Sequence, residues 1–238
     1  MRRTCYGALT GLVLLLVTLC GCRAAGVDMT GPAAVAEEPG RVVELPDPLH
    51  DSDVSVEEAL LHRRSVRSYS VEALSLDELS QLLWAAQGVT DPRGFRSAPS
   101  AGALYPLELY ALAGEVEDLA PGLYRYEPRR HQLLHTLDGD LRSGLAEAAL
   151  WQEPVAQGAV VMVFTAVYER TTQKYDERGI RYVHIELGHA AQNLCLQATA
   201  LDLGAVTIGA FFDDEVTALL DLPEDERPLY LIPVGRQK

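Results

Sequence analysis

The stretch from Arg181 to Phe212 constrains the fold most, because it has the pattern of a long buried helix that leads directly into a buried strand. The helix is about 22 residues long, or roughly 33 Å at about 1.5 Å per residue, and its many small residues would let other backbones approach closely. The run AVTIGAF then predicts a core strand, in which Gly209 indicates a close approach to the backbone. The helix's apolar residues recur at spacings of three and four and share one face: Ile180, Val183, Leu187, Ala190, Leu194, Ala198 and Leu201.

Residues 51–238 predict one α+β or α/β domain with a central mixed sheet flanked by helices. Ser55 and Ser75 each begin a capping-box pattern that starts a helix, and Gly88 ends the second helix. The continuous apolar run at 158–168 indicates a strand buried on both faces. Further strands are expected at 107–113, 123–127, 132–137 and 229–234, and further helices at 141–150 and 213–220.

The chain is acidic, with a net charge of −14 from 34 Asp and Glu against 20 Lys and Arg. This charge argues against nucleic acid as a partner and against docking on anionic lipid by charge.

The first 22 residues look like an export signal rather than part of the fold. Arg2 and Arg3 precede an apolar run that is too short to span a bilayer comfortably. Leu19-Cys20-Gly21-Cys22 resembles the lipobox of bacterial lipoproteins. We therefore expect a signal peptide at 1–21, acylation at Cys22, a tether at 22–50, and a protein that is lipid-anchored to the cell envelope. The alternative is an ordinary secretory signal that is cleaved nearby. Cys195 is then left without a disulfide partner, and we expect it to be a small apolar residue of the core.

Two segments have residues suited to ligand binding. Arg63, Arg64, Ser65 and Arg67 bring three cations and a hydroxyl together, and guanidinium groups suit a phosphate. The alternative is a helix end whose cations complement the helix dipole. Residues 98–106 have the small side chains needed where backbone amides approach a ligand, although a plain turn before a strand would look the same.

These blocks together resemble a known family. RRSVRSY, PSAGALYPLELY, IELGHAAQNLCLQATALDLGAVTIGAF and PLYLIPVGR occur in the order seen in the FMN-dependent nitroreductase superfamily, over residues 52–236. They are most similar to the SagB-type dehydrogenase branch, which forms thiazoles and oxazoles. The resemblance implies a nitroreductase fold and an intertwined homodimer that binds two FMN molecules at its interface. The long helix, including Ala191 and Ala198, would supply much of that interface.

The resemblance also implies roles for individual residues. In this family's pattern the arginines and Ser65 of the first block would hold the FMN phosphate, and Arg236 would add a further basic contact. Ser100 and Gly102 would approach the flavin from the partner chain. Ile208 and Gly209 would lie against the ring system, with a backbone N–H near N5.

Lys174 and Tyr175 resemble a Lys-Tyr pair that azoline-oxidising members use to remove a proton while hydride leaves to FMN. A solvated charged loop is the alternative. Glu186 and His189 have the one-turn spacing of carboxylate metal sites, but no second pair exists, so we expect no metal.

The predicted function is hydride transfer between a small or peptidic substrate and FMN. Because NAD(P)H is not supplied outside the inner membrane, the expected export favours a SagB-type dehydrogenase. An NAD(P)H-dependent nitro or quinone reductase, a non-catalytic lipid-tethered flavin-binding or partner-recruiting module, and a fold without flavin remain as alternatives.

Overall fold

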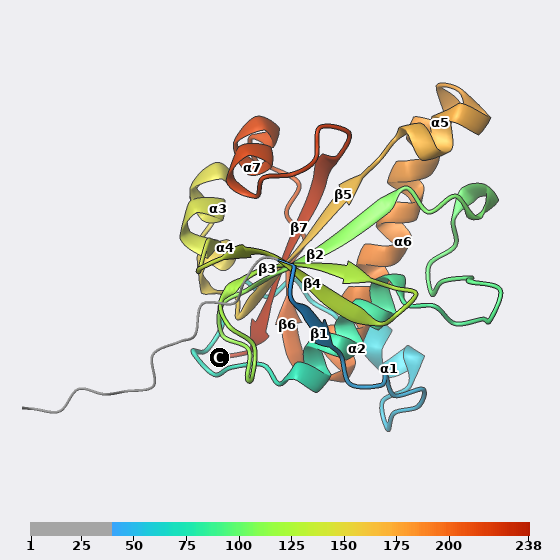
Figure 1. Ribbon diagram of the computed structural model, residues 1–238. Helices are drawn as coiled ribbons and strands as arrows, with labels where there is room; N and C mark the ends of the chain where they lie inside the picture. Colours follow the sequence, from blue (N-terminus) through green and yellow to red (C-terminus); the bar gives the residue numbers. More distant parts are fainter. Residues whose placement is uncertain (1–39) are drawn as a thin grey trace, which may run out of the picture. The chain divides into compact units, whose positions relative to one another are not determined.

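The computed structural model describes residues 40–238, which form a seven-stranded sheet with helices on both faces (Figure 1). The strands are β1 (Val42–Glu44), β2 (Leu107–Ala113), β3 (Gly122–Glu127), β4 (Gln132–Asp138), β5 (Val160–Ala166), β6 (Leu203–Ala205) and β7 (Arg227–Arg236). The helices are α1 (Val56–His62), α2 (Leu76–Gln87), α3 (Arg142–Ala148), α4 (Glu153–Gln157), α5 (Glu169–Tyr175), α6 (Arg178–Ala200) and α7 (Asp213–Leu219), with a 3₁₀ turn at Ala101–Ala103.

The sheet has the strand order β1-β4-β3-β2-β5-β7-β6. Every ladder is antiparallel, whereas the sequence suggested a mixed sheet. The helical excursions α3–α4 and α5–α6 each return the chain so that the next strand runs opposite to its neighbours. Strand β5 is buried along its whole length, which confirms the prediction for its apolar run.

Two hydrophobic cores cover the two faces of the sheet. Helices α2 and α6 pack on one face, and α3, α4 and α7 pack on the other. The long helix α6 is confirmed, and its buried face includes Val183, Leu187, Ala190 and Leu194. Each buried leucine contributes about 1.5–3 kcal/mol relative to an exposed one, so α6 is a principal source of the domain's stability.

Ala191 and Ala198 do not lie on an open face of α6. They are 3% and 1% exposed and pack in the chain's own core, against the expectation of a dimer surface there. The exposed side of α6 carries Ile185, which is 49% exposed, together with Gly188 and Gln192. A contact between copies through α6 would therefore use this other side.

The predicted helix starts are confirmed. Ser75 accepts a hydrogen bond from the Glu78 N–H at 3.2 Å, and the Glu78 carboxylate accepts one from the Ser75 N–H at 2.8 Å. Ser55 caps α1 by accepting from the Glu58 N–H at 3.0 Å. Such caps contribute about 1 kcal/mol each. They fix where α1 and α2 begin and thus where the segment between them lies.

Three parts of the chain differ from the predicted elements. Of the predicted strand AVTIGAF only Ala205 belongs to β6, and Ile208 forms an isolated bridge with Leu231. Helix α5 occupies a segment that has no apolar periodicity. The predicted 141–150 helix is observed as the shorter α3, and α4 follows it.

The N-terminal predictions fall mostly on residues that the structure does not describe. The signal at 1–21 and the acylated Cys22 lie outside the described residues 40–238. Within the predicted tether, Val42–Glu44 pair with β4 and Leu49 is hydrogen-bonded to Gln81, so ordered structure begins before residue 50. No helix within residues 40–238 is long and apolar enough to cross a membrane.

Candidate functional site

A cavity of about 330 Å³ lies where the segment after α1, helix α6 and the segment after β6 meet. It joins two blocks that the sequence singled out, because Ser65 pairs with Ala205 and the Val66 N–H donates to the Ala205 carbonyl at 3.0 Å. Gly204 permits this approach, since a Cβ there would lie 2.6 Å from Val66. The lining residues are Arg63, Ser65, Gly188, Ala191, Gln192, Cys195, Ala205, Val206, Thr207 and Tyr230.

The segment after β6 offers free backbone donors beside this cavity. The Ile208 N–H is already bonded to the Leu231 carbonyl at 2.8 Å. The N–H groups of Thr207 and Gly209 have no hydrogen-bond partner among residues 40–238. A Cβ on Gly209 would meet only the Tyr230 ring, at 3.5 Å. The close approach that Gly209 predicts is therefore not made by the described part of this chain, and Gly209 rather than Ile208 has the available donor.

The predicted phosphate ligands do not all face the cavity. Arg63 and Ser65 line it. Arg64 turns back and donates to the carbonyls of Leu61 and Arg63 at 2.9 and 2.8 Å, as a cation at a helix end does. Arg67 is exposed and is not among the lining residues.

Arg236 is held by carboxylates of its own chain. Its guanidinium is 3.0 Å from Glu78 and 3.2 Å from Glu72. These partners compete with any phosphate for the same donors. The first group of site residues is thus Arg63, Ser65 and the segment 205–209.

A second group forms around the 3₁₀ turn. Gly102 has φ 65°, and a Cβ there would lie 2.9 Å from the Tyr175 hydroxyl and 3.0 Å from the Lys174 amine. The ends of both side chains therefore converge on Gly102, which the sequence did not foresee. Ser100 precedes the turn, and its hydroxyl oxygen accepts the Tyr105 N–H at 2.9 Å.

The two groups lie on opposite sides of α6. Asn193 donates to the carbonyl of Ser97 in the loop before the 3₁₀ turn, and Glu186 lies on the same side of the helix, whereas Gly188 faces the cavity. Positions 186 and 188 are about 200° apart around a helix, so about 10 Å of helix separates the two sides. Within one copy of the chain, the two groups of residues therefore do not face each other.

A network of charged side chains, with Arg96 and Glu108 partly buried and Arg170 exposed, lies behind the second group. The Arg96 guanidinium stacks 4.4 Å from the centre of the Tyr105 ring and donates to Gln87 at 2.8 Å. Glu108 binds Arg170 at 2.6 Å, and Arg170 also donates to the Tyr105 carbonyl at 3.1 Å. Burial lowers the pKa of Arg96, and the nearby carboxylates of Glu108 and Glu186 oppose that shift.

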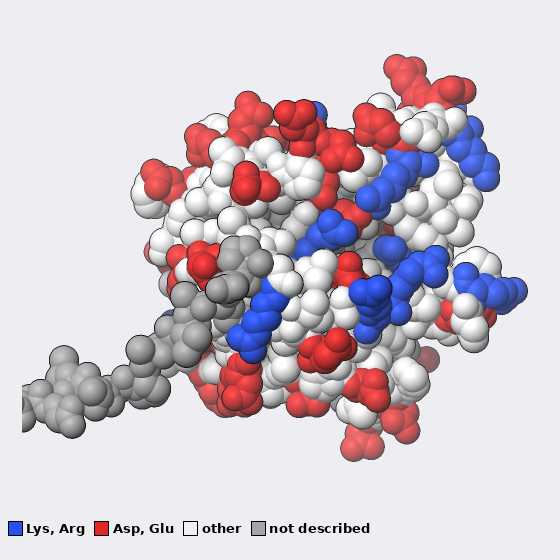
Figure 2. All heavy atoms as spheres, in the orientation of Figure 1, with Lys and Arg blue, Asp and Glu red and all other residues white. Residues whose placement is uncertain are grey.

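One face of the molecule has a basic area although the chain as a whole is acidic. Figure 2 shows Lys and Arg side chains gathered near the middle of one face, with Asp and Glu mostly toward its rim. Sequence reasoning missed Arg96, Glu108 and Arg170, because their contacts join segments that are far apart in the chain.

Glu186 and His189 do not act together in the structure. Glu186 is 2% exposed, whereas His189 is exposed. Burial raises the pKa of Glu186 to about 7, against the opposing effects of the nearby Ser100 hydroxyl and the charge of Arg96. No cluster of three or more potential metal ligands occurs within the described range 40–238. Cys195 is free and buried, and burial raises the pKa of its thiol to about 11.

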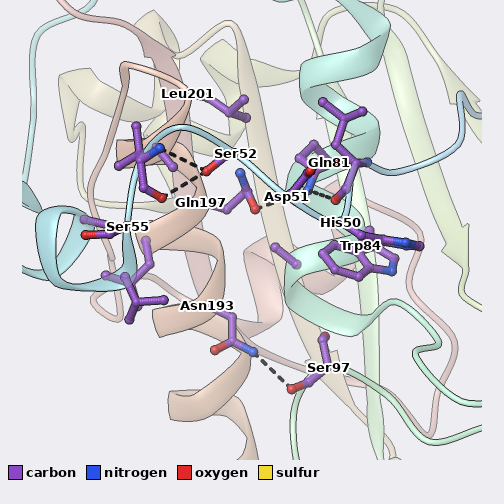
Figure 3. Close-up of a pocket in the computed structure, with 17 residues that line it drawn as sticks. His50, Asp51, Ser52, Ser55, Gln81, Trp84, Ser97, Asn193, Gln197 and Leu201 are labelled. Carbon is purple, nitrogen blue, oxygen red and sulfur yellow. Dashed lines mark hydrogen bonds between the residues drawn. The ribbon is translucent and has the colours of Figure 1, made fainter.

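A larger cleft of about 570 Å³ lies between residues 49–56, α2 and α6 (Figure 3). His50 and Trp84 stack at its edge with ring centres 5.3 Å apart, and Asn193 donates to the Ser97 carbonyl at 3.4 Å. None of the predicted site residues lines it. Nearby, α1 exposes the apolar side chains of Val56, Leu60 and Leu61.

The chain is similar to proteins of known family. The model of the nitroreductase family matches residues 60–236. A Methanocaldococcus jannaschii protein described as a nitroreductase is 48% identical over 195 residues, which cover 82% of this chain and 96% of that protein. A crystal structure described as a nitroreductase from Ralstonia eutropha has a TM-score of 0.73 at 30% identity and covers 83% of this chain and 90% of that one.

Two further similar proteins, one matched in sequence and one in fold, have more specific names. The microcin B17-processing protein McbC of Escherichia coli is 27% identical over 163 residues, or 63% of this chain and 58% of that protein. The NADPH:FMN oxidoreductase of Vibrio harveyi, solved with NAD⁺, shares the fold with a TM-score of 0.57 at 21% identity, covering 77% of this chain and 69% of that one. The match over residues 60–236, together with the identity to the Methanocaldococcus protein, shows that this chain belongs to the nitroreductase family of oxidoreductases.

Proposed function

We propose that the chain holds FMN in the cavity beside Arg63 and Ser65 and transfers hydride between a substrate and the flavin. The cavity carries the proposal: on a nitroreductase fold, about 330 Å³ of space adjoins a cation, a hydroxyl and unpaired backbone N–H groups. The likeness in fold to an NADPH:FMN oxidoreductase supports the choice of flavin.

The residues present suit FMN. Arg63 offers a guanidinium group for the phosphate, with Ser65 beside it. The unpaired N–H groups of Thr207 and Gly209 can donate to the polar edge of the ring system, where negative charge grows on reduction. Gly188 leaves the cavity wall open, since nothing lies within 4 Å of its Cβ position. When bound, FMN would supply the hydride chemistry, which no side chain can provide.

The second group would complete the site of another copy. In one chain, Ser100, Gly102, Lys174 and Tyr175 lie across α6 from the cavity. The exposed strip that carries Ile185 runs between the two sides, so a second copy seated on that strip would bring its 3₁₀ turn toward the cavity. We infer a homodimer in which Lys174 and Tyr175 remove a proton from a substrate bound against the partner's flavin.

We favour a SagB-type dehydrogenase that acts on a small or peptidic substrate. The similarity to McbC, which is named for processing microcin B17, supports a peptide-derived substrate. The likeness in fold to the Vibrio harveyi NADPH:FMN oxidoreductase instead favours the alternative, an NAD(P)H-dependent nitro or quinone reductase.

We also propose that the protein is exported and anchored to the cell envelope by lipid on Cys22. The support is the sequence alone, which combines a basic start, an apolar run and a lipobox-like motif. Two or more acyl chains give stable anchoring, whereas one binds only reversibly. Cys22→Ala should shift the protein out of the membrane fraction and leave flavin binding unchanged. A variant that still pellets with membranes would contradict the anchor.

An absorption spectrum of the purified protein tests the main proposal. We expect a yellow protein whose flavin is bleached anaerobically by a peptide-derived substrate rather than by NADPH. Bleaching by NADPH alone would select the reductase. Flavin that no donor bleaches would point to a non-catalytic binding module, and a protein that stays colourless after soaking with FMN would refute flavin binding.

A further inference from the structure

Three arginines lie around one carboxylate near the 3₁₀ turn, and the proposed function gives them no role. One oxygen of Glu108 is 2.6 Å from the Arg170 guanidinium, and its other oxygen is 3.7 Å from the Arg125 Nε atom. Arg96 is joined to them through Tyr105, because its guanidinium stacks on the Tyr105 ring and Arg170 donates to the Tyr105 carbonyl. We call Arg96, Arg125 and Arg170 the arginine cluster.

The arginine cluster has hydrogen-bond donors that the described part of the chain leaves unused. Each guanidinium group has five N–H donors. Arg125 makes no hydrogen bond within residues 40–238, and its Nε atom is buried. The side chain as a whole is 39% exposed, so a ligand can reach the rest of the guanidinium. A buried guanidinium nitrogen without a partner is unfavourable, so a ligand that accepted from Arg125 would be bound with a gain in free energy.

The carboxylates closest to Arg125 do not satisfy it. Glu108 stays 3.7 Å from the Arg125 Nε atom, which is beyond hydrogen-bond distance. Glu226 is on the same face of the sheet, since it binds Tyr110, the cross-strand neighbour of Arg125. Its carboxylate already accepts hydrogen bonds from the hydroxyls of Tyr110 and Thr165. Arg125 is therefore open to a carboxylate from outside the chain.

The arginine cluster lies beside the proposed base. Arg170 and Lys174 are four residues apart on α5, so their side chains leave the same face of this helix. Arg170 reaches the Tyr105 carbonyl, and a Cβ on Gly102 would lie 3.0 Å from the Lys174 amine. These two contacts are made to one short segment of the chain. A group that Arg170 binds would therefore lie close to the group on which Lys174 acts.

We propose that the arginine cluster binds a carboxylate of the substrate, so that the preferred substrate is a peptide with an acidic residue near the atoms that react. The inference rests on the proposed function, in which the substrate is peptide-derived and Lys174 is its base. The planar guanidinium group matches a carboxylate, with which it can form two parallel hydrogen bonds. The net charge of −14 disfavours a long polyanion, which favours an acidic peptide over a nucleic acid.

The test compares two C-terminally amidated peptides, Gly-Ser-Glu-Ser-Gly and Gly-Ser-Gln-Ser-Gly, which carry the same rhodamine label and differ by one carboxylate. Their dissociation constants are measured by fluorescence anisotropy on the purified full chain after addition of FMN. Arg125→Gln is the main variant, because Arg125 makes no hydrogen bond that the fold would lose. Arg93→Gln is the matched control, since it removes the same charge from the loop that contains Arg96, but the Arg93 guanidinium is already bound by Asp91 at 2.8 and 3.0 Å.

We expect the wild type to bind the glutamate peptide about tenfold more tightly than the glutamine peptide, which corresponds to about 1.4 kcal/mol. Arg125→Gln should lower this ratio severalfold, whereas Arg93→Gln should keep it. Equal affinities of the wild type for the two peptides, or an unchanged ratio in Arg125→Gln, would overturn the carboxylate site.

Arg170→Gln supplies a second test from another element of the fold, and it should lower the ratio as well. An unchanged ratio in this variant would contradict a site that Arg125 and Arg170 share. Tighter binding of a labelled single-stranded oligonucleotide than of the glutamate peptide, lost in Arg125→Gln, would overturn the choice of an acidic peptide.

The same samples separate this inference from the proposed function. A wild-type protein that binds no FMN would refute the proposed function and the assignment of the peptide as substrate. FMN binding together with equal affinities for the two peptides would remove the carboxylate site alone.

Discussion

The buried carboxyl group of Glu186 leads to a prediction about the pH dependence of the stability of the flavin-free protein. Its pKa is raised from 4.5 to about 7 in the folded chain, so the folded state binds its proton more tightly than the unfolded state does. Stability from this group is fully present below pH 4.5 and is lost as pH rises toward 7. A shift of this size corresponds to about 3 kcal/mol at about 1.4 kcal/mol per unit.

Glu186→Gln removes this titration, because an amide keeps the shape of the acid without a proton to lose. We expect the unfolding free energy of the variant, relative to that of the wild type, to increase by up to about 3 kcal/mol between acid and neutral pH. Urea denaturation at several values from about pH 5 to about pH 8 measures both proteins. Burial also raises the pKa of Glu226, but this residue is present in both proteins, so its contribution cancels when the two unfolding free energies are subtracted.

The pH dependence of this difference in unfolding free energy depends on the burial of the Glu186 side chain. A difference that stayed within about 0.5 kcal/mol over the whole range, as for a typical surface substitution, would refute the reasoning. It would mean that Glu186 is ionised and solvated in the folded protein. Glu117→Gln, at an exposed glutamate in the turn after β2, is the control and should show such a flat difference.

Three further outcomes test the site and the assembly. Arg63→Ala should weaken FMN binding by roughly one to two decades, since a hydrogen bond to a charged group contributes about 1.5–3 kcal/mol. Arg64→Ala should change FMN binding little, because the Arg64 guanidinium donates to helix carbonyls. Equal losses of affinity in the two variants would contradict this difference between the two arginines. Lys174→Ala should slow substrate-dependent flavin reduction in stopped-flow experiments with an unchanged FMN dissociation constant, and a loss of FMN binding would contradict its role as a base. Ile185→Glu should dissociate the homodimer in sedimentation experiments because it buries an unpaired charge, whereas Val71→Glu, at a position that is 97% exposed, should not. A dimeric Ile185→Glu protein would exclude this side of α6 as the interface.

Local patterns in the sequence predicted the elements that hold the domain together. The spacing of apolar residues along α6, the capping box at Ser75 and the continuous apolar run of β5 depend on neighbours within a few positions, and all three are confirmed. Two elements whose own sequences have no apolar pattern were missed. Strand β1 has three residues, too few for any periodicity, and exists because it pairs with β4. Helix α5 has a polar sequence and is held where Gly179 of α6 lets the two backbones approach, since a Cβ there would lie 2.9 Å from Thr172.

For the candidate site, too, the sequence predicted some residues but not the contacts that orient their side chains. Motifs identified Arg63, Ser65 and the segment around Gly209. The structure brings these parts together, because Ser65 pairs with Ala205, and Arg63, Ser65 and residues 205–207 line one cavity. They could not predict that Arg236 is bound by Glu72 and Glu78, because those carboxylates lie more than a hundred residues away in the chain. Side-chain direction at a site depends on such distant partners, which a motif does not contain.

The arrangement around α6 links assembly to chemistry. One side of the helix lines the cavity, and the side about 200° away carries Glu186 and Asn193, whose amide donates to the Ser97 carbonyl. If the exposed strip with Ile185 seats a second copy, each cavity is completed by the Ser100 hydroxyl of the other chain. On this reasoning a monomer would lack the part of the site that the other chain supplies, so flavin affinity should depend on protein concentration wherever the dimer dissociates.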